Sequence, residues 1–113
     1  MAARSHSIAW ITVAAVLTLF AAAPAEAQSF SCRTTNNCTE AVICSDHQLG
    51  RLDEKMADRY YKLRSLSGRR EARQLLEGQR DWLADRNSCG CNADCLIDYY
   101  TSRIRQFDRL LEE

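Results

Sequence analysis

Proline is almost absent from this chain of 113 residues. The single proline is Pro24, so no proline interrupts a helix in the chain beyond it. From about residue 46 onward, apolar residues recur at spacings of three and four, which is the period of an amphipathic helix. The sequence therefore predicts an all-α domain.

The usual elements of catalysis are also missing. His47 is the only histidine beyond the N-terminal region, and it lies in a polar stretch where a solvated side chain is expected. No histidine pair for a metal, no convincing serine–histidine–carboxylate arrangement and no glycine-rich phosphate loop is present. We therefore expect no enzyme, no cofactor and no metal site, and a binding or inhibitory module fits better.

The chain has no excess of either charge, because 15 Lys and Arg balance 15 Asp and Glu. Without a basic excess, neither nucleic acid nor an anionic membrane is an expected partner. A protein partner is expected instead, and the sequence leaves the oligomeric state open.

Residues 1–27 have the pattern of a secretory signal peptide. An apolar run over residues 8–23 is followed by Ala25-Glu26-Ala27, which matches an A-x-A cleavage site. The alternative is an uncleaved membrane anchor, but this run is shorter than the roughly 20 residues that span a bilayer. The prediction is a periplasmic or secreted domain over residues 28–113, without membrane attachment after cleavage. No lipobox precedes Cys32, so a lipid anchor is not expected.

Six cysteines follow the predicted signal peptide: Cys32, Cys38, Cys44, Cys89, Cys91 and Cys95. An even number in a small exported domain predicts disulfides, here up to three, although sequence alone does not choose the pairing. A zinc site at Cys89-x-Cys91-x3-Cys95 is the alternative, which the export signal disfavours. A redox-active pair has little support because no Cys-x-x-Cys occurs.

Four helices are expected, with polar residues at their starts that can act as caps. A short helix ends near Cys44, with Asn37 or Thr39 as its cap. Ser45 or Asp46 can cap a long helix from about Asp46 to Leu66, and Ser67 can cap a second long helix that runs to about Asn87. Asn92 can cap the last helix, which is predicted over residues 93–111. With such short connections, we expect a small disulfide-stapled antiparallel three-helix bundle with an additional short N-terminal helix.

Polar residues interrupt the apolar stripes of these helices. Tyr60 and Trp82 are the expected core anchors, whereas Asp53 borders its stripe and Gln79, Arg86 and Arg103 lie on theirs. A charge at such a position needs a partner. We expect Asp53 to pair with Arg86, Arg103 or both, with Gln79 hydrogen-bonded nearby. An internal ion pair that fixes helix register is favoured over a ligand pocket.

Together these residues make the chain resemble the LprI-like N-terminal domain family, whose name-giving protein is a lysozyme inhibitor. The resemblance covers nearly all of residues 30–110. It is carried by Phe30-x-Cys32, Glu40-x-x-Ile43-Cys44-Ser45-Asp46, Leu49-x-x-Leu52-Asp53, Tyr60, Gln79-Arg80-x-Trp82-Leu83-x-x-Arg86-x-x-Cys89, Cys95-Leu96 and Tyr100-x-x-Arg103-Ile104.

The resemblance implies disulfides Cys32–Cys44 and Cys89–Cys95. Cys38 and Cys91 depart from the family pattern, and the simplest pairing for these two remaining cysteines is a disulfide with each other. The resemblance also implies that lysozyme is the protein partner. A basic turn that enters the acidic catalytic cleft would suit inhibition, and Ser67, Arg69 and Arg70 form the candidate inhibitory turn. A plain loop at the start of a helix is the favoured alternative for the same residues.

Two other functions are compatible with the same sequence. The first is a structural or interaction module of the cell envelope that has another protein partner and no inhibitory activity. The second is a small-ligand binder that uses Asp53, Gln79, Arg86 and Arg103, which would require a concave polar site open to solvent.

Overall fold

The computed structural model describes residues 2, 3, 5, 7, 14, 15 and 29–113. Residues 29–113 form four helices and no strand: α1 (Cys38–Ser45), α2 (His47–Leu66), α3 (Arg69–Asn87) and α4 (Ala93–Glu112). The predicted all-α class is confirmed. The predicted signal peptide lies almost entirely outside the described residues and stays a prediction. Within the described part, no helix combines the length and apolarity needed to cross a membrane.

Three of the expected helix caps are confirmed. Side-chain oxygens of Asn37, Asp46 and Asn92 accept hydrogen bonds from backbone N–H groups in the first turns of α1, α2 and α4. These bonds measure 2.8, 2.9 and 3.0 Å. Each satisfies a donor that the helix itself leaves without a partner, so these three starts are set by local sequence.

The expected cap of α3 is wrong. Gly68 occupies the position before the helix and makes no side-chain cap hydrogen bond. The hydroxyl of Ser67 instead donates to the carbonyl oxygen of Leu63 at 2.6 Å, so it closes the last turn of α2. A serine between two helices can serve either helix, and here the preceding one uses it.

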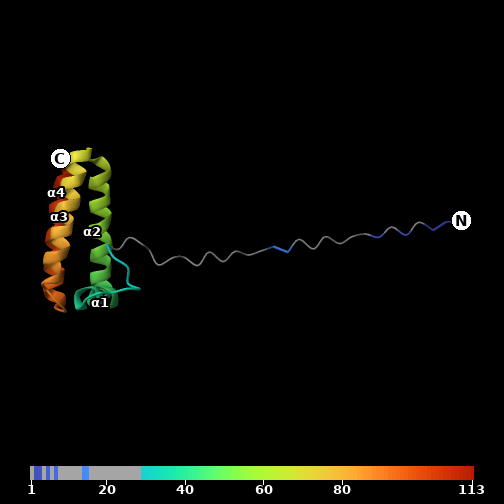
Figure 1. Cartoon of the computed structure of the whole chain (residues 1–113), viewed down its shortest axis with the longest axis horizontal. Coiled ribbons are helices and arrows are strands. Elements are labelled where there is room, and N and C mark those ends of the chain that lie inside the picture. Colours follow the sequence, from blue (N-terminus) through green and yellow to red (C-terminus); the bar gives the residue numbers. More distant parts are fainter. Residues whose placement is uncertain (1, 4, 6, 8–13, 16–28) are drawn as a thin grey trace.

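The helices α2, α3 and α4 lie side by side, and α1 crosses one end of them (Figure 1). The C-terminus lies at the opposite end, beside the connection between α2 and α3. The helix α2 packs against each of the other three. The backbones of α3 and α4 approach each other less closely than those of α2 and α4.

Most of the buried apolar core comes from α2 and α4. Its members are Ile43, Leu49, Met56, Tyr60, Leu63, Leu96, Tyr100, Ile104 and Phe107. By contrast, the buried residues of α3 are polar, Gln79 and Arg86, and its leucines are only partly buried. Leu66 and Leu110 continue the apolar periodicity of α2 and α4, but they are 72% and 41% exposed at the end of the bundle.

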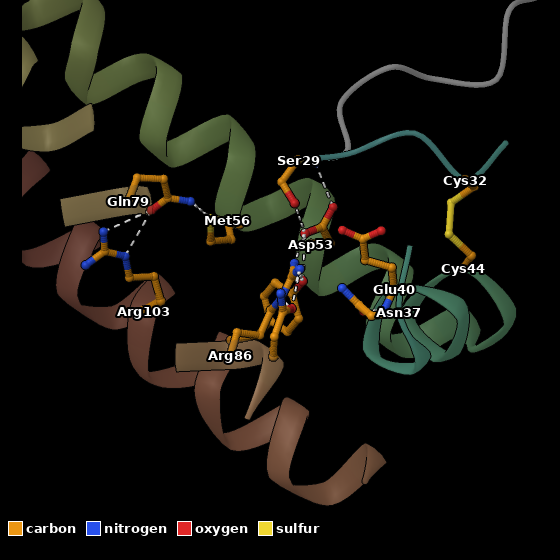
Figure 2. A network of polar contacts seen from close by, with 12 residues as sticks. Ser29, Cys32, Asn37, Glu40, Cys44, Asp53, Met56, Gln79, Arg86 and Arg103 are labelled. Atoms are coloured by element: carbon orange, nitrogen blue, oxygen red, sulfur yellow. Dashed lines mark hydrogen bonds and ion pairs between the residues drawn. A yellow bond between two sulfur atoms is a disulfide. The ribbon is translucent and has the colours of Figure 1, made fainter. Parts of the chain in front are cut away.

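Three disulfides gather at the α1 end of the molecule. They are Cys32–Cys44, Cys38–Cys91 and Cys89–Cys95, with Cα–Cα distances of 5.8, 5.3 and 5.7 Å. These are the pairings expected above. The first ties the N-terminal segment to α1 (Figure 2). The other two fasten the start of α1 to the turn before α4 and close that turn.

A buried hydroxyl strengthens the same attachment. Thr39 is 1% exposed, and its Oγ1 donates to the carbonyl oxygen of Gly90 at 2.7 Å. Gly90 has a φ of 58°, a conformation that glycine adopts without the steric cost of a side chain. The turn over residues 88–92 is therefore held to α1 by a covalent bond and a hydrogen bond together.

Candidate functional site

Asp53 forms the centre of a buried polar network. It is 0% exposed, whereas helix periodicity predicts a position at the edge of its stripe. Its Oδ1 accepts hydrogen bonds from the hydroxyls of Tyr100 and Ser29, both at 2.7 Å, and its Oδ2 accepts one from the Ser29 amide at 2.8 Å. Ser29 reaches it from the segment before α1 (Figure 2). That segment completes the burial of the carboxylate, which helix periodicity does not reveal.

Arg86 is the cation that pairs with Asp53. Its Nη1 lies 3.8 Å from Oδ1 of Asp53 and donates a 2.9 Å hydrogen bond to the hydroxyl of Tyr100. Its guanidinium also lies over the ring of Phe30, 5.3 Å from the ring centroid. The expected ion pair between Asp53 and Arg86 is therefore present, with a tyrosine hydroxyl joined to both charges.

Sequence reasoning missed Tyr100 and Ser29. Periodicity places Tyr100 on an apolar stripe, but a buried tyrosine usually needs a hydrogen-bond partner for its hydroxyl, and that requirement was the available signal. No signal marked Ser29, because its contact spans 24 residues from an irregular segment.

The network is neutral and closed. Burial raises the pKa of Tyr100 above its usual value, and the Asp53 carboxylate adds to this shift while Arg86 opposes it. Tyr100 therefore remains protonated and acts as a donor to the carboxylate. Because Asp53 and Arg86 are 0% and 2% exposed, solvent does not reach them. This arrangement holds α2, α3 and α4 in register and offers no open site to a ligand.

Arg103 and Gln79 form a second group, apart from the first (Figure 2). Arg103 does not pair with Asp53. Its Nε and Nη2 donate to Oε1 of Gln79 at 3.2 and 2.9 Å, and its Nη1 donates to Oε1 of Gln106 at 2.8 Å. The Gln79 amide donates in turn to the sulfur of Met56 at 3.0 Å. The four polar residues expected to meet thus separate into two pairs.

The guanidinium of Arg103 is packed between aromatic rings. It lies 4.4 Å from the centroid of Phe107 and 5.7 Å from that of Trp82. Burial lowers the pKa of Arg103, an effect that the nearby Tyr60 opposes. Among residues 29–113, no carboxylate oxygen lies within 4.0 Å of it. Arg103 is therefore a partly buried cation held by neutral amides.

The two expected core anchors, Tyr60 and Trp82, differ in how deeply they are buried. Tyr60 is 5% exposed and belongs to the core, and its hydroxyl has no hydrogen-bond partner within the described residues. Trp82 is only partly buried. It packs at the edge of the core, with ring centroids 5.2 Å from Tyr100 and 6.4 Å from Tyr99. Trp82 therefore contacts the core from its edge, whereas Tyr60 lies within it.

Arg103 also lines an open depression between α3 and α4. One part, of about 370 Å³, is bordered by Trp82, Asp98, Tyr99, Ser102, Arg103 and Gln106. A second part, of about 500 Å³, continues toward the C-terminal end of the bundle and shares Arg103 and Gln106 with the first. Below, this depression is called the α3–α4 groove.

The candidate inhibitory turn lies at the same end as the C-terminus. Arg69 and Arg70 are exposed, whereas Ser67 is partly buried and its hydroxyl is bound to Leu63. Beside the turn, Leu66 is 72% exposed. His47 is exposed at the start of α2. In the part of the chain that is described, no group of three His, Cys, Asp or Glu residues is placed to hold a metal ion.

Comparison with known proteins identifies the family. The family model described as "Lysozyme inhibitor LprI" matches residues 31–107. No curated protein and no solved structure gave a match. The matched region includes α1, α2, α3, the three disulfides and α4 as far as Phe107. The chain therefore belongs to the lysozyme inhibitor LprI family.

Proposed function

We propose that this protein is an exported binding module that inhibits lysozyme or a related cell-wall hydrolase. The observation that carries the proposal is the family match over residues 31–107. Three disulfides are consistent with export, because such bonds persist in oxidising compartments outside the cytoplasm. The predicted signal peptide over residues 1–27 would direct the chain out of the cytoplasm.

The surface proposed to meet the enzyme is the turn between α2 and α3. The turn's Arg69 and Arg70 and the neighbouring Lys62, Arg64 and Arg73 are all exposed, while Glu71 is the one acidic residue between positions 62 and 73. Lysozyme works with two carboxyl groups in its cleft. A local cationic surface on an otherwise neutral protein would be attracted to that cleft and oriented by it.

Two features suit this turn to binding. It is short and connects two long helices, so ordering it on binding would cost little conformational entropy. Leu66 adds an exposed apolar side chain among the cations, which a partner can bury. Because the hydroxyl of Ser67 is already bound to Leu63, the proposal rests on Arg69 and Arg70, with Ser67 as a structural member of the turn.

The test is inhibition of lysozyme-driven lysis of a peptidoglycan substrate by the full chain, produced by export so that its disulfides form. We expect the wild-type protein to slow lysis and the Arg69→Ala/Arg70→Ala variant to be at least about tenfold weaker. Removal of one charge-assisted hydrogen bond from such an interface typically weakens binding by this order.

The control is Arg51→Ala/Lys55→Ala, which removes the same charge from exposed positions of α2. It should inhibit within about twofold of the wild type, because interface mutations act through local contacts. If the wild-type protein does not slow lysis, the inhibitory function is wrong. If it does and the two double variants are equally potent, inhibition uses another surface and the turn is wrong.

A further inference from the structure

The partly buried Arg103 has a charge that the fold does not neutralise. The carboxylate expected as its partner, Asp53, is occupied by Ser29, Tyr100 and Arg86. The oxygens that Arg103 does bind belong to the neutral amides of Gln79 and Gln106. A desolvated cation is costly without a counter-charge, so a bound anion would be stabilised here.

The guanidinium is oriented before any ligand arrives. Three of its N–H groups donate to the two glutamines, which leaves two of the five donors of an arginine available. Its face is fixed over Phe107 at 4.4 Å, so rotation of the planar group is restricted. A fixed planar guanidinium is well suited to a carboxylate, which it can bind through parallel hydrogen bonds.

The walls of the α3–α4 groove next to Arg103 combine aromatic and hydrogen-bonding side chains. Trp82 and Tyr99 are partly exposed and stand 6.4 Å apart between ring centroids. Asp98, Ser102 and Gln106 are exposed along the same part of the groove. An apolar platform with a few convergent polar groups is the usual composition of a small-molecule site.

These polar groups favour a sugar over a peptide strand. Strand addition needs an open sheet edge, and residues 29–113 contain no strand. A sugar ring offers C–H groups to aromatic faces and hydroxyls to amide, hydroxyl and carboxylate side chains. Glu71 and Glu113 line the far part of the groove, so its anion site is restricted to the surroundings of Arg103.

We propose that the α3–α4 groove binds a carboxylate-bearing saccharide, with the carboxylate on Arg103 and the sugar ring against Trp82 and Tyr99. Asp98, Ser102 and Gln106 supply hydrogen-bond partners for the hydroxyls of the ring. The part of the groove around Arg103 and Trp82 contains no residue of the turn between α2 and α3, which only the far part reaches through Ser67. Saccharide binding and lysozyme inhibition can therefore be tested independently.

The experiment is a titration of the isotope-labelled full chain, followed by NMR shifts of the Trp82 indole and of the backbone amides of residues 98–106. The probes are N-acetylmuramic acid, N-acetylglucosamine, which lacks its lactyl carboxylate, and acetate, which lacks the sugar. We expect saturable shifts with N-acetylmuramic acid and at least tenfold weaker binding of the other two. The proposal would be overturned if either control bound as tightly as N-acetylmuramic acid. It would also be overturned if N-acetylmuramic acid caused no shift in these residues.

Two sets of variants locate the site. Arg103→Gln should weaken binding of N-acetylmuramic acid at least tenfold and leave the weak binding of N-acetylglucosamine within about twofold, a selectivity that loss of folding would not produce. Ser102→Trp, at an exposed helical position that lines the groove, should block it, whereas Arg105→Trp, at an exposed position of the same helix that does not line it, should bind within about threefold of the wild type. Unchanged binding by a folded Ser102→Trp would contradict the assignment. Arg69→Ala/Arg70→Ala should bind the probe like the wild type.

Discussion

Tyr100 on α4 donates a 2.7 Å hydrogen bond to Oδ1 of Asp53 on α2, across 47 positions of the sequence. The same hydroxyl accepts from Arg86 on α3 at 2.9 Å. One oxygen atom therefore connects all three long helices and mediates between a buried anion and a buried cation. Each of these groups is withdrawn from water, so removal of one should leave its partner buried without a hydrogen bond and lower the stability of the protein.

Removal of the Tyr100 hydroxyl should destabilise the protein without leaving a large cavity. We expect Tyr100→Phe to lower the free energy of unfolding by about 1.5–3 kcal/mol, the usual contribution of a hydrogen bond to a charged group. Urea denaturation with the disulfides intact measures the effect. Tyr99→Phe is the matched control, because within residues 29–113 the Tyr99 hydroxyl makes no hydrogen bond, and it should cost under about 0.5 kcal/mol. Equal effects of the two changes would contradict the assigned role.

The same hydroxyl predicts a dependence on alkaline pH. Burial raises the pKa of Tyr100, so the folded state keeps a proton that an unfolded tyrosine releases near its ordinary pKa of about 10. The unfolded state then binds fewer protons, and the contribution of Tyr100 to stability is full below about pH 10 and declines above it. The difference in unfolding free energy between wild type and Tyr100→Phe should therefore shrink from about pH 9 to about pH 11. Urea titrations across this range test it, and a constant difference would argue against the raised pKa.

The disulfides should contribute unequally to the free energy of unfolding. Cys38–Cys91 closes a sequence separation of 53, whereas Cys89–Cys95 closes one of 6. In the chain-entropy account the two disulfides stabilise the folded state by about 4 and about 2 kcal/mol. The longer loop counts for more because closing it removes more conformational entropy from the unfolded chain. Urea denaturation of the two paired Cys→Ser variants compares them. A greater loss from the short loop would show that native contacts, and not loop closure, dominate.

Two glycines should respond to alanine in opposite directions. A Cβ built at Gly78 meets nothing within 4 Å, so Gly78→Ala should stabilise α3 by about 0.5–1 kcal/mol through helix propensity. Gly90 has equal space but a φ of 58°, so Gly90→Ala should destabilise by about 1 kcal/mol. Thermal unfolding of the two variants gives the signs directly. A stabilised Gly90→Ala would mean that this turn relaxes to another conformation.

The local features of the fold could be predicted because their causes lie close together in sequence. The caps Asn37, Asp46 and Asn92 act on backbone groups three residues away. The wrong cap, Ser67, shows the limit of such prediction, since its hydroxyl had an equally local alternative at Leu63. The exposed Leu66 shows another limit, because apolar periodicity does not tell where the neighbouring helix ends.

The polar network was predictable in part. The need of Asp53 for a cationic partner followed from its position near an apolar stripe, and Arg86 was one of two candidates. The choice between Arg86 and Arg103 depended on how α3 and α4 are rotated about α2, which no local pattern encodes. Ser29 and Phe30 entered the network from an irregular segment that Cys32–Cys44 attaches to α1.

By itself, the sequence determined the helical class, three of the four helix starts, the chemistry of the cysteines and the family. These depend on periodicity, capping and residue type, which act over a few positions or are preserved as a spaced pattern. Only the tertiary structure decided that Tyr100 and Ser29 would satisfy Asp53, that the leucines of α3 would be only partly buried, and that Arg103 would be left without a carboxylate beside a groove. Those outcomes depend on the relative rotation and distance of whole helices, because a side chain meets its partner only after the packing of the core has set both.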